Sequence, residues 1–473
     1  MPTSRGEPTA VELLELLRRR ELSARELAED RLARVEVADR RLNAVAHLDH
    51  EATLAEADAA DRALAAGESG ALLGLPLSVK DSLAVAGRPC CSGSWARADH
   101  VPDVDATVVA RVRRAGAVVL CKTTLPEYTW SVETESALHG RTRNPYDLER
   151  TSGGSSGGEA ALHAVDASPL GIGSDGLCSI RVPCHFCGTV GLRPTTGLVP
   201  ETGVWPTTKD TGMLDMSTIG PMGRAVEDVE LLLRVLAGPD DIDPLVSAAP
   251  IGDVDAVELR GLRVGLYASV SATPATPGTR ASIERAGRAL ESVGARVEAV
   301  EPPSLDEAVE LGFAMMAADG GAQARADLGA AGGRHVSQVP ELLAGLEPLA
   351  LSAAEFFALM RRWATLRSEL RRFVSGFDVV LCPVAAGPAP LPGRRPGDGG
   401  VLTDYGDYGY AFAYAIAGVP GAVVPAGSEG GLPVGIQVLA GAFRDHVALA
   451  AARALEAELA DVLPPLVADV ARP

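Results

Sequence analysis

Residues 151–191 read TSGGSSGGEAALHAVDASPLGIGSDGLCSIRVPCHFCGTVG, and this stretch decides how the rest of the chain is organised. Two glycine-rich loops, each with serines, enclose a short apolar segment. Glycine allows backbone conformations that other residues avoid, and serine hydroxyls can act as covalent nucleophiles. This density of both residue types suits covalent catalysis better than core packing. We therefore expect the flanking chain to be the scaffold of this stretch.

The segment before this stretch predicts a strand, a helix and a second strand. The run Leu75–Val79 is short and apolar and ends at Lys80, which is typical of a buried strand. Asp105 is the expected N-cap of an amphipathic helix that ends at Gly116, and Val118–Cys121 follows as the next strand. This strand–helix–strand order predicts α/β architecture.

The same alternation continues after the stretch. Apolar runs predict strands at residues 188–192, 262–267, 296–300, 379–382, 422–425 and 435–439. Helical patterns cover residues 225–237, 281–293, most of 305–375, and a last helix from Asp445. A proline- and glycine-rich loop, Pro383–Gly400, is expected to cover the site or to be mobile.

The chain begins with a predicted helical arm, residues 1–70. Ser23 and Glu26 form a capping-box pattern at the start of a helix, and residues 43–66 continue the helical pattern. With 473 residues, no internal repeat and no linker, the chain is expected to form one domain, 1–473. Residues 71–240 would be the core with the catalytic residues, and 241–473 the remaining sheet, helices and covering loops.

Composition argues against several classes of partner. Asp and Glu outnumber Lys and Arg by 62 to 43, and no stretch concentrates basic residues, so direct nucleic-acid binding is not expected. The N-terminus has charges where a secretory signal needs an apolar core, which predicts a cytoplasmic protein. The uncharged run Tyr408–Gly427 has the length of a membrane span, but its prolines and glycines favour a buried core segment.

Seven cysteines in a long chain without a signal favour reduced thiols. Cys184 and Cys187 form a CxxC pair beside His185 and near Cys178, a pattern that can bind zinc or do redox chemistry. A second pair of ligands with metal spacing is missing from the sequence. We therefore expect no metal and no other cofactor.

A serine nucleophile needs a base, and the sequence favours lysine over histidine. None of the eight histidines lies in a glycine-rich loop, and the GxSxG motif is absent. Lysine has an ordinary pKa of about 10.4, so it acts as a base near neutral pH only where burial lowers that value. Lys80, at the end of a buried strand, meets this condition. The alternative is an ammonium group that reaches solvent or pairs with Asp81.

These blocks together resemble the amidase signature family. The matching segments, in order, are GLPLSVKD around Lys80, GGSSGG at 153–158, GSDGLCSIRVP at 173–183, FCGTVGLRPTTGLVP at 186–200, GPMGRAVEDV at 220–229 and GLPVGIQVLAGAFRD at 431–445. Ser155 lies 75 residues after Lys80 and Ser179 lies 24 residues after Ser155, which is the family's catalytic spacing. The resemblance covers nearly the whole chain. It implies a central mixed β-sheet flanked by helices.

The resemblance also implies a Ser–Ser–Lys triad. Ser179 would be the nucleophile, Ser155 the bridging serine at a cis peptide bond, and Lys80 the base. Neutral Lys80 would take the proton of Ser155, which takes that of Ser179, and the route would reverse to protonate the leaving amine. Asp175 and Arg181 would brace the nucleophile loop.

The same resemblance assigns the surroundings of the nucleophile. The expected oxyanion hole is the backbone N–H groups of Gly176, Leu177 and Cys178, and the expected acyl pocket includes Thr129 with Trp130 and Trp205. Family members usually have Thr-Gly-Gly before the nucleophile, so the side chains at 177 and 178 are a departure. Backbone donors survive this change, but the added bulk puts the substrate range in question.

The resemblance implies an amidase that cleaves a linear C–N amide bond of a small-molecule substrate through a serine acyl-enzyme. An acyltransferase or cyclase with the same triad is the first alternative. The glutaminase subunit of a tRNA-dependent amidotransferase, or a protein that binds without catalysis, is the second. No membrane partner is expected, and the sequence leaves a homodimer open.

Overall fold

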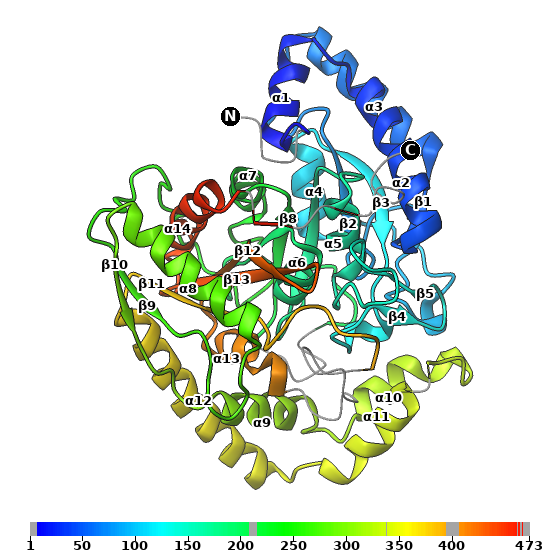
Figure 1. Cartoon of the computed structure of the whole chain (residues 1–473). Coiled ribbons are helices and arrows are strands. Elements are labelled where there is room, and N and C mark those ends of the chain that lie inside the picture. The colour runs from blue at the N-terminus through cyan, green and yellow to red at the C-terminus, as the bar shows by residue number, and fades with distance from the viewer. Residues whose placement is uncertain are drawn as a thin grey trace.

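One mixed sheet runs through the molecule. The computed structural model describes residues 7–207, 215–336, 338–393, 406–460, 462, 463 and 466. In these residues an 11-stranded sheet has the order β1-β3-β2-β6-β8-β7-β12-β13-β11-β9-β10 (Figure 1). The strands are β1 (Val45–Leu48), β2 (Pro76–Lys80), β3 (Val118–Thr123), β6 (Leu170–Asp175), β7 (Val190–Arg193), β8 (Thr218–Gly223), β9 (Arg263–Leu266), β10 (Arg296–Ala299), β11 (Val379–Pro383), β12 (Gly421–Glu429) and β13 (Leu432–Ala440). The expected α/β class with a mixed sheet is confirmed.

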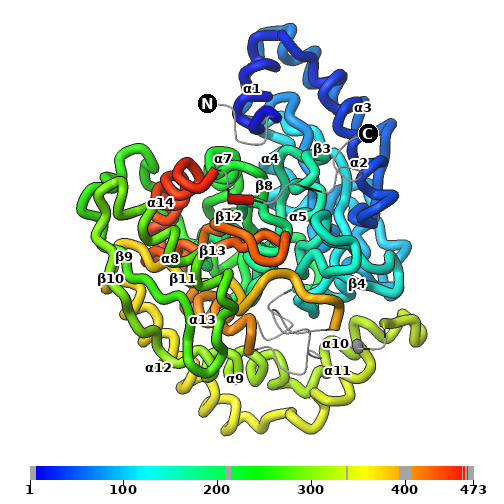
Figure 2. Tube along the Cα trace, viewed as in Figure 1, coloured from blue at the N-terminus to red at the C-terminus, as the bar shows by residue number. Residues whose placement is uncertain are grey.

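Helices surround this sheet. They are α1 (Ala10–Arg19), α2 (Ala24–Leu42), α3 (His50–Ala65), α4 (Thr107–Arg114), α5 (Gly157–Ala164), α6 (Arg181–Cys187), α7 (Val226–Leu236), α8 (Pro277–Ser292), α9 (Leu305–Met316), α10 (Ala322–Leu328), α11 (Gln338–Leu346), α12 (Ala353–Ser375), α13 (Gly409–Ala417) and α14 (Asp445–Glu458). A separate hairpin joins β4 (Glu135–Ser136) to β5 (Gly140–Arg141). Figure 2 shows α1–α3 at one end of the molecule and α9–α12 along the opposite edge.

The two faces of the sheet pack against different helices. Along β12, Ala422 and Val424 belong to the hydrophobic cluster that includes residues of α8 and α14, whereas Val423 belongs to the cluster with α6, α9, α12 and α13. Successive strand residues point to opposite faces, so a strand covered on both sides must be apolar throughout. This requirement explains why β2 and β3 were recognisable as continuous apolar runs.

Two parts of the predicted secondary structure are wrong. The expected helix over residues 43–66 is interrupted, because Asn43 adopts the left-handed conformation that ends α2 and β1 then pairs antiparallel with β3. The Asp39 carboxylate accepts hydrogen bonds from the N–H groups of Ala44 and Val45 and so fixes the direction of the chain after α2. The N-cap of α4 is Ala106, not Asp105, whose carboxylate instead accepts from the N–H of Ala86 (2.7 Å).

The central strands β6 and β8 were not predicted. Their sequences, LGIGSD and TIGPMG, contain glycines where strands usually have branched side chains. The packing requires these glycines, because a side chain at Gly171 would overlap Glu159 and one at Gly173 would overlap Met222. The glycines of β6 therefore reflect the close approach of Glu159 on α5 and of the Met222 side chain on the neighbouring strand β8.

The run 408–427 forms α13 and the start of β12 and is almost entirely buried, which confirms the core assignment. No single helix among the described residues has the length and apolar composition of a membrane span. The segments 339–349 and 353–375 pass that test only as a pair, bent by 104°. Of the loop 383–400, residues 394–400 lie outside the described residues, and Gly393 donates its N–H to Glu133 Oε1 (2.8 Å).

Candidate active site

Lys80 is the last residue of β2 and is completely buried. Its Nζ donates to Ser155 Oγ at 2.7 Å and to Ser174 Oγ at 2.9 Å. Burial lowers the pKa of Lys80 to about 7, although the negative charges of Asp175 and Glu159 oppose this change. The alternative pairing with Asp81 does not occur, because the Asp81 carboxylate forms its ion pair with Lys122 (2.9 Å).

Ser155 and Ser179 line one cavity. Ser155 follows a cis peptide bond from Gly154, as the resemblance implied, and is 1% exposed. Ser179 lies in the loop between β6 and α6 and is partly exposed. The N–H of Ser156 donates to the Ser179 carbonyl at 3.1 Å, which fixes the two loops side by side. The three residues predicted to form the triad thus come together, and their catalytic roles stay predictions.

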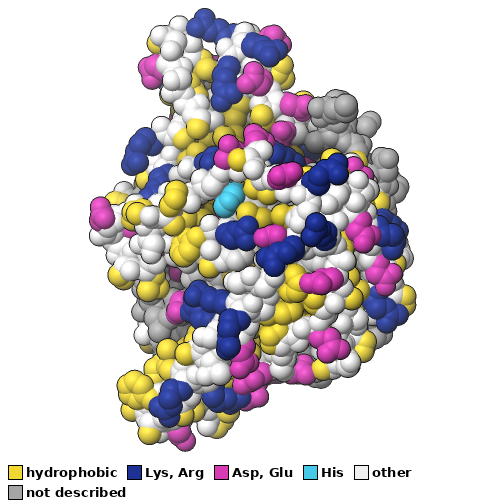
Figure 3. Space-filling view, turned by 90° about the vertical axis from the view of Figure 1, so that its left-hand side faces the viewer, with side chains coloured by type: hydrophobic (Ala, Val, Ile, Leu, Met, Phe, Trp, Pro, Cys, Tyr) yellow, Lys and Arg dark blue, Asp and Glu magenta, His cyan; other side chains and the backbone are white. Residues whose placement is uncertain are grey.

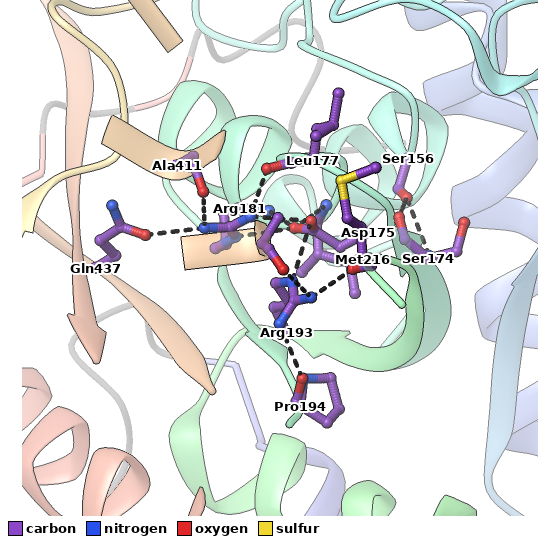
Figure 4. Close-up of polar contacts among 12 residues, drawn as sticks. Ser156, Ser174, Asp175, Leu177, Arg181, Arg193, Pro194, Met216, Ala411 and Gln437 are labelled. Carbon is purple, nitrogen blue, oxygen red and sulfur yellow. Dashed lines mark hydrogen bonds and ion pairs between the residues drawn. The ribbon is translucent and has the colours of Figure 1, made fainter. Parts of the chain in front are cut away.

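A buried ion pair braces the loop that contains Ser179, the predicted nucleophile. Asp175 accepts from Arg181 Nε and Nη2, both at 3.0 Å, and from the N–H of Ile180 at 3.1 Å (Figure 4). Burial alone would raise the pKa of Asp175, but the guanidinium groups of Arg181 and Arg193 lower it below its ordinary value. Arg181 also donates to Gln437 Oε1 and to a carbonyl of α13, so the loop is tied to β13 and α13.

The same arginine orients the loop of residues 176–178. Arg181 Nη2 donates to the Leu177 carbonyl at 2.6 Å, and in Figure 4 the Leu177 side chain points away from Arg181. In a planar trans peptide the carbonyl and the next N–H point in opposite directions. The Cys178 N–H is therefore directed away from Arg181. Burial raises the pKa of the Cys178 thiol well above its ordinary value, so this thiol stays neutral.

Ser174 and the polar cluster behind Lys80 were not predicted from the sequence. Ser174 lies on β6, the parallel neighbour of β2, so its hydroxyl reaches Lys80. In the cluster, Glu159 accepts from Ser78 Oγ at 2.5 Å and Thr123 Oγ1 at 2.8 Å and lies 3.2 Å from His163 Nε2. Recognition of β6 as a strand beside β2 would have located Ser174.

His185 and the neighbouring cysteines occupy scaffold positions. His185 Nδ1 accepts from the N–H of Gly435 at 2.8 Å, its Nε2 lies 2.9 Å from the Gly387 carbonyl, and burial lowers its pKa to about 4. Burial raises the thiol pKa of Cys184 to about 12 and that of Cys187 well above its ordinary value. Within the described part of the chain, no group of three or more His, Cys, Asp or Glu side chains is arranged to hold a metal ion.

The cavity in front of the serines has a volume of about 910 Å³, including the part open to solvent. Its described lining is Thr129, Trp130, Ser131, Val132, Ser155, Ser174, Gly176, Leu177, Cys178, Ser179, Val204, Pro206, Ser217, Phe313, Met316, Leu342, Leu346 and Phe412. Thr129 and Trp130 are thus where the acyl pocket was expected. Trp205 is not in this set, and its ring packs edge-on against Tyr128 (5.3 Å).

Comparisons with known proteins find similar sequences and folds over nearly the whole chain. A family model described as Amidase matches residues 26–449. A curated relative from Roseiflexus sp. (strain RS-1), one of the subunits of a glutamyl-tRNA(Gln) amidotransferase, is 33% identical over 463 residues, covering 92% of this chain and 93% of that protein. The peptide amidase of Stenotrophomonas maltophilia has a TM-score of 0.83 at 29% identity, covering 97% of this chain and 98% of that chain. A bacterial aryl acylamidase of the amidase signature family has a TM-score of 0.85 at 28% identity, covering 95% and 96%.

Proposed function

The chain belongs to the amidase signature family, and on that premise we propose that it hydrolyses a linear small-molecule amide. Ser179 is the nucleophile, Ser155 the bridging serine and Lys80 the base. The observation that carries this proposal is the hydrogen bond of 2.7 Å between Lys80 Nζ and Ser155 Oγ, in a buried setting that opens onto the cavity containing Ser179.

Acylation begins when Ser179 Oγ attacks the substrate carbonyl carbon. Its proton passes to Ser155 Oγ while the Ser155 proton passes to the neutral amine of Lys80. The carbonyl oxygen becomes an oxyanion, which accepts hydrogen bonds from backbone N–H groups of the loop 176–179. The C–N bond then breaks as the proton returns from Lys80 through Ser155 to the leaving nitrogen.

Deacylation repeats the same proton route with water. Water loses a proton to the Ser155–Lys80 pair as it attacks the acyl-enzyme, and Ser179 recovers its proton when the carboxylic acid leaves. An amine or hydroxyl in place of water would make the enzyme an acyltransferase or cyclase. Mass spectrometry of the products, with and without added amines, distinguishes hydrolysis from transfer.

Covalent labelling tests the nucleophile. A fluorophosphonate should form one adduct that peptide mapping places on Ser179, and Ser179→Ala should abolish it. Undiminished labelling of the variant would reject Ser179 as the nucleophile.

The relatives named as subunits of glutamyl-tRNA(Gln) amidotransferases support a second candidate function, that of a glutaminase within a complex. That function requires glutamine hydrolysis and a partner protein. We favour a small molecule over RNA as the direct ligand, because acidic residues exceed basic ones and both signs are interspersed on the face in Figure 3. Size-exclusion chromatography with light scattering distinguishes a monomer, a homodimer and a complex with a copurified partner.

A further inference from the structure

The cavity has two chemically different ends. Serine hydroxyls and the loop 176–179 surround the reaction centre, whereas α9, α11 and α13 contribute a wall whose described lining side chains are all apolar. Leu342 and Leu346 are four residues apart on α11, and Phe313 and Met316 are three apart on α9, so each pair lies on one helix face. The rings of Phe313 and Phe412 have centroids 6.1 Å apart and connect α9 to α13. All five of these lining side chains are apolar.

Charge is missing from the described lining of the cavity. Its residues include no Asp, Glu, Lys, Arg or His. The ammonium and carboxylate groups of glutamine would lose water on entry, and a buried charge without a partner is strongly unfavourable. An uncharged apolar group loses no such hydration and gains contact with the helix wall.

Leu177 narrows the cavity beside the nucleophile. It is 9% exposed, and its Cδ2 lies 3.5 Å from the point where a Cβ on Gly312 of α9 would be. The hydrogen bond from Arg181 to the Leu177 carbonyl fixes the backbone and therefore the direction of this side chain. Leu177 thus occupies space next to Ser179 and leaves the α9–α11 wall to contact the distal part of an acyl group.

We infer that this cavity binds the acyl group of an uncharged, apolar amide, with Phe313, Met316, Leu342, Leu346 and Phe412 as the residues that determine specificity. The inference rests on the proposed amide hydrolysis and names its substrate class. It separates this chain from a glutaminase, because glutamine has two charged groups beside its acyl chain.

A series of straight-chain carboxamides from acetamide to hexanamide, with glutamine as the charged competitor, tests the inference. Each added methylene should raise kcat/KM about fourfold until the wall is covered, because burial of one CH₂ contributes about 0.8 kcal/mol. Glutamine should be hydrolysed more slowly than pentanamide, whose acyl chain is equally long. Faster hydrolysis of glutamine, or a flat series, would overturn the inference.

Substitutions in α11 test whether the apolar helix wall determines which acyl group is preferred. Leu342→Ala with Leu346→Ala should lower the ratio of hexanamide to acetamide kcat/KM by about tenfold or more, from the loss of several buried carbons. Leu342→Met with Leu346→Met keeps the volume and should retain most of the ratio. Leu349→Ala is the matched control, because Leu349 is 52% exposed and outside the lining. An unchanged ratio in the double alanine variant would contradict the assignment.

Fluorophosphonate labelling of Ser179 keeps the two proposals distinguishable. Labelling together with a preference for glutamine would leave the amidase proposal intact and overturn the substrate class. Absence of both labelling and amide hydrolysis would reject the proposed function itself.

Discussion

Lys80 Nζ donates a 2.7 Å hydrogen bond to Ser155 Oγ, and both residues are at most 1% exposed. The low pKa of Lys80 depends on its position at the end of β2, where neighbouring strands exclude solvent on both sides. A solvated lysine would be protonated at neutral pH and could only donate to the serine, whereas burial brings its pKa to about 7 and makes the neutral form available. Its place at the end of a buried strand thus gives Lys80 the low pKa that the proposed base requires.

Replacement of the base should slow acylation without preventing substrate binding. Lys80→Ala is expected to lower the acylation rate by about 10² to 10⁴, the range typical for loss of a general base. Stopped-flow measurement with a chromogenic amide checks this. Lys122→Ala controls for the loss of a buried lysine, because the ammonium group of Lys122 contacts Asp81 and not the serines. A near-normal acylation rate in Lys80→Ala would remove Lys80 from the mechanism.

The pH dependence of acylation shows whether the neutral or the protonated form of Lys80 is active. The neutral amine is the active form, so acylation should increase from about pH 5 and level off above a pKa of about 7. An ordinary lysine would give a rate that still rises towards about pH 10. A rate independent of pH between about 6 and 9, with chemistry rate-limiting, would contradict the prediction.

Burial of Lys80 should also make stability depend on pH. The folded-state pKa is below the unfolded value, so between about pH 7 and 10.5 the unfolded state binds more protons and stability rises with pH. Lys80→Met should therefore unfold at higher urea concentration than the native protein at about pH 7, by up to about 4 kcal/mol. The difference should shrink towards about pH 10; a constant difference would show that packing, not ionisation, causes it.

The ion pair between Asp175 and Arg181 should be essential for folding of the nucleophile loop. Both side chains are fully buried, so Arg181→Met leaves Asp175 with an incompletely compensated charge and should cost about 3–5 kcal/mol. Urea unfolding measures this loss. Arg362→Met is the matched control, because its ion pairs with Glu307 and Glu310 are exposed and should contribute less than about 1 kcal/mol. Equal effects of the two variants would contradict a special role for the buried pair.

Metal should not accompany the purified protein in stoichiometric amount. Both ring nitrogens of His185 have backbone hydrogen-bond partners, the Gly435 N–H and the Gly387 carbonyl, and the raised thiol pKa values of Cys184 and Cys187 oppose the thiolate form that zinc requires. Elemental analysis of protein purified without chelator checks this. About one tightly held zinc per chain would contradict it.

The sequence was informative where one physical requirement dominates. Strands β2, β3 and β11 are covered on both faces and therefore read as apolar runs, and the Ser23–Glu26 capping box marks the start of α2 as expected. It was less informative where tertiary contacts override local preference. Asn43 could not be recognised as a helix end, because the decisive partners of its side chain are the distant carbonyls of His139 and Arg141.

The residues of the site also divide into those that the sequence predicts and those that only the fold brings together. Lys80, Ser155 and Ser179 could be located because each lies in a motif with fixed spacing. The wall formed by α9, α11 and α13 could not, because its side chains are ordinary core residues in sequence and meet the serines only through the fold. Ser174 was missed because β6, with its glycines, has the composition of a loop.

Leu177 and Cys178 provide the sharpest test of how the nucleophile loop affects substrate choice. Leu177→Gly with Cys178→Gly removes both side chains and keeps the backbone donors. If these side chains act by occupying space beside α9, branched and aromatic acyl amides should gain selectively in kcat/KM, while the best substrate of the native enzyme changes little or becomes worse. The measurement is kcat/KM for acyl groups of increasing width, with Arg181 unchanged so that the loop anchor is kept.

An effect on the oxyanion hole would have a different signature. Loss or gain of one backbone donor changes the rate by about 10² to 10³ for every substrate, because the oxyanion is the same whatever acyl group is attached. The Arg181 hydrogen bond to the Leu177 carbonyl constrains the peptide that presents the Cys178 N–H, so we expect the hole to be intact in the native loop. A uniform gain across acyl widths in the diglycine variant would contradict this and indicate a loop that impairs the oxyanion hole, which would favour a slow biosynthetic transferase over a hydrolase.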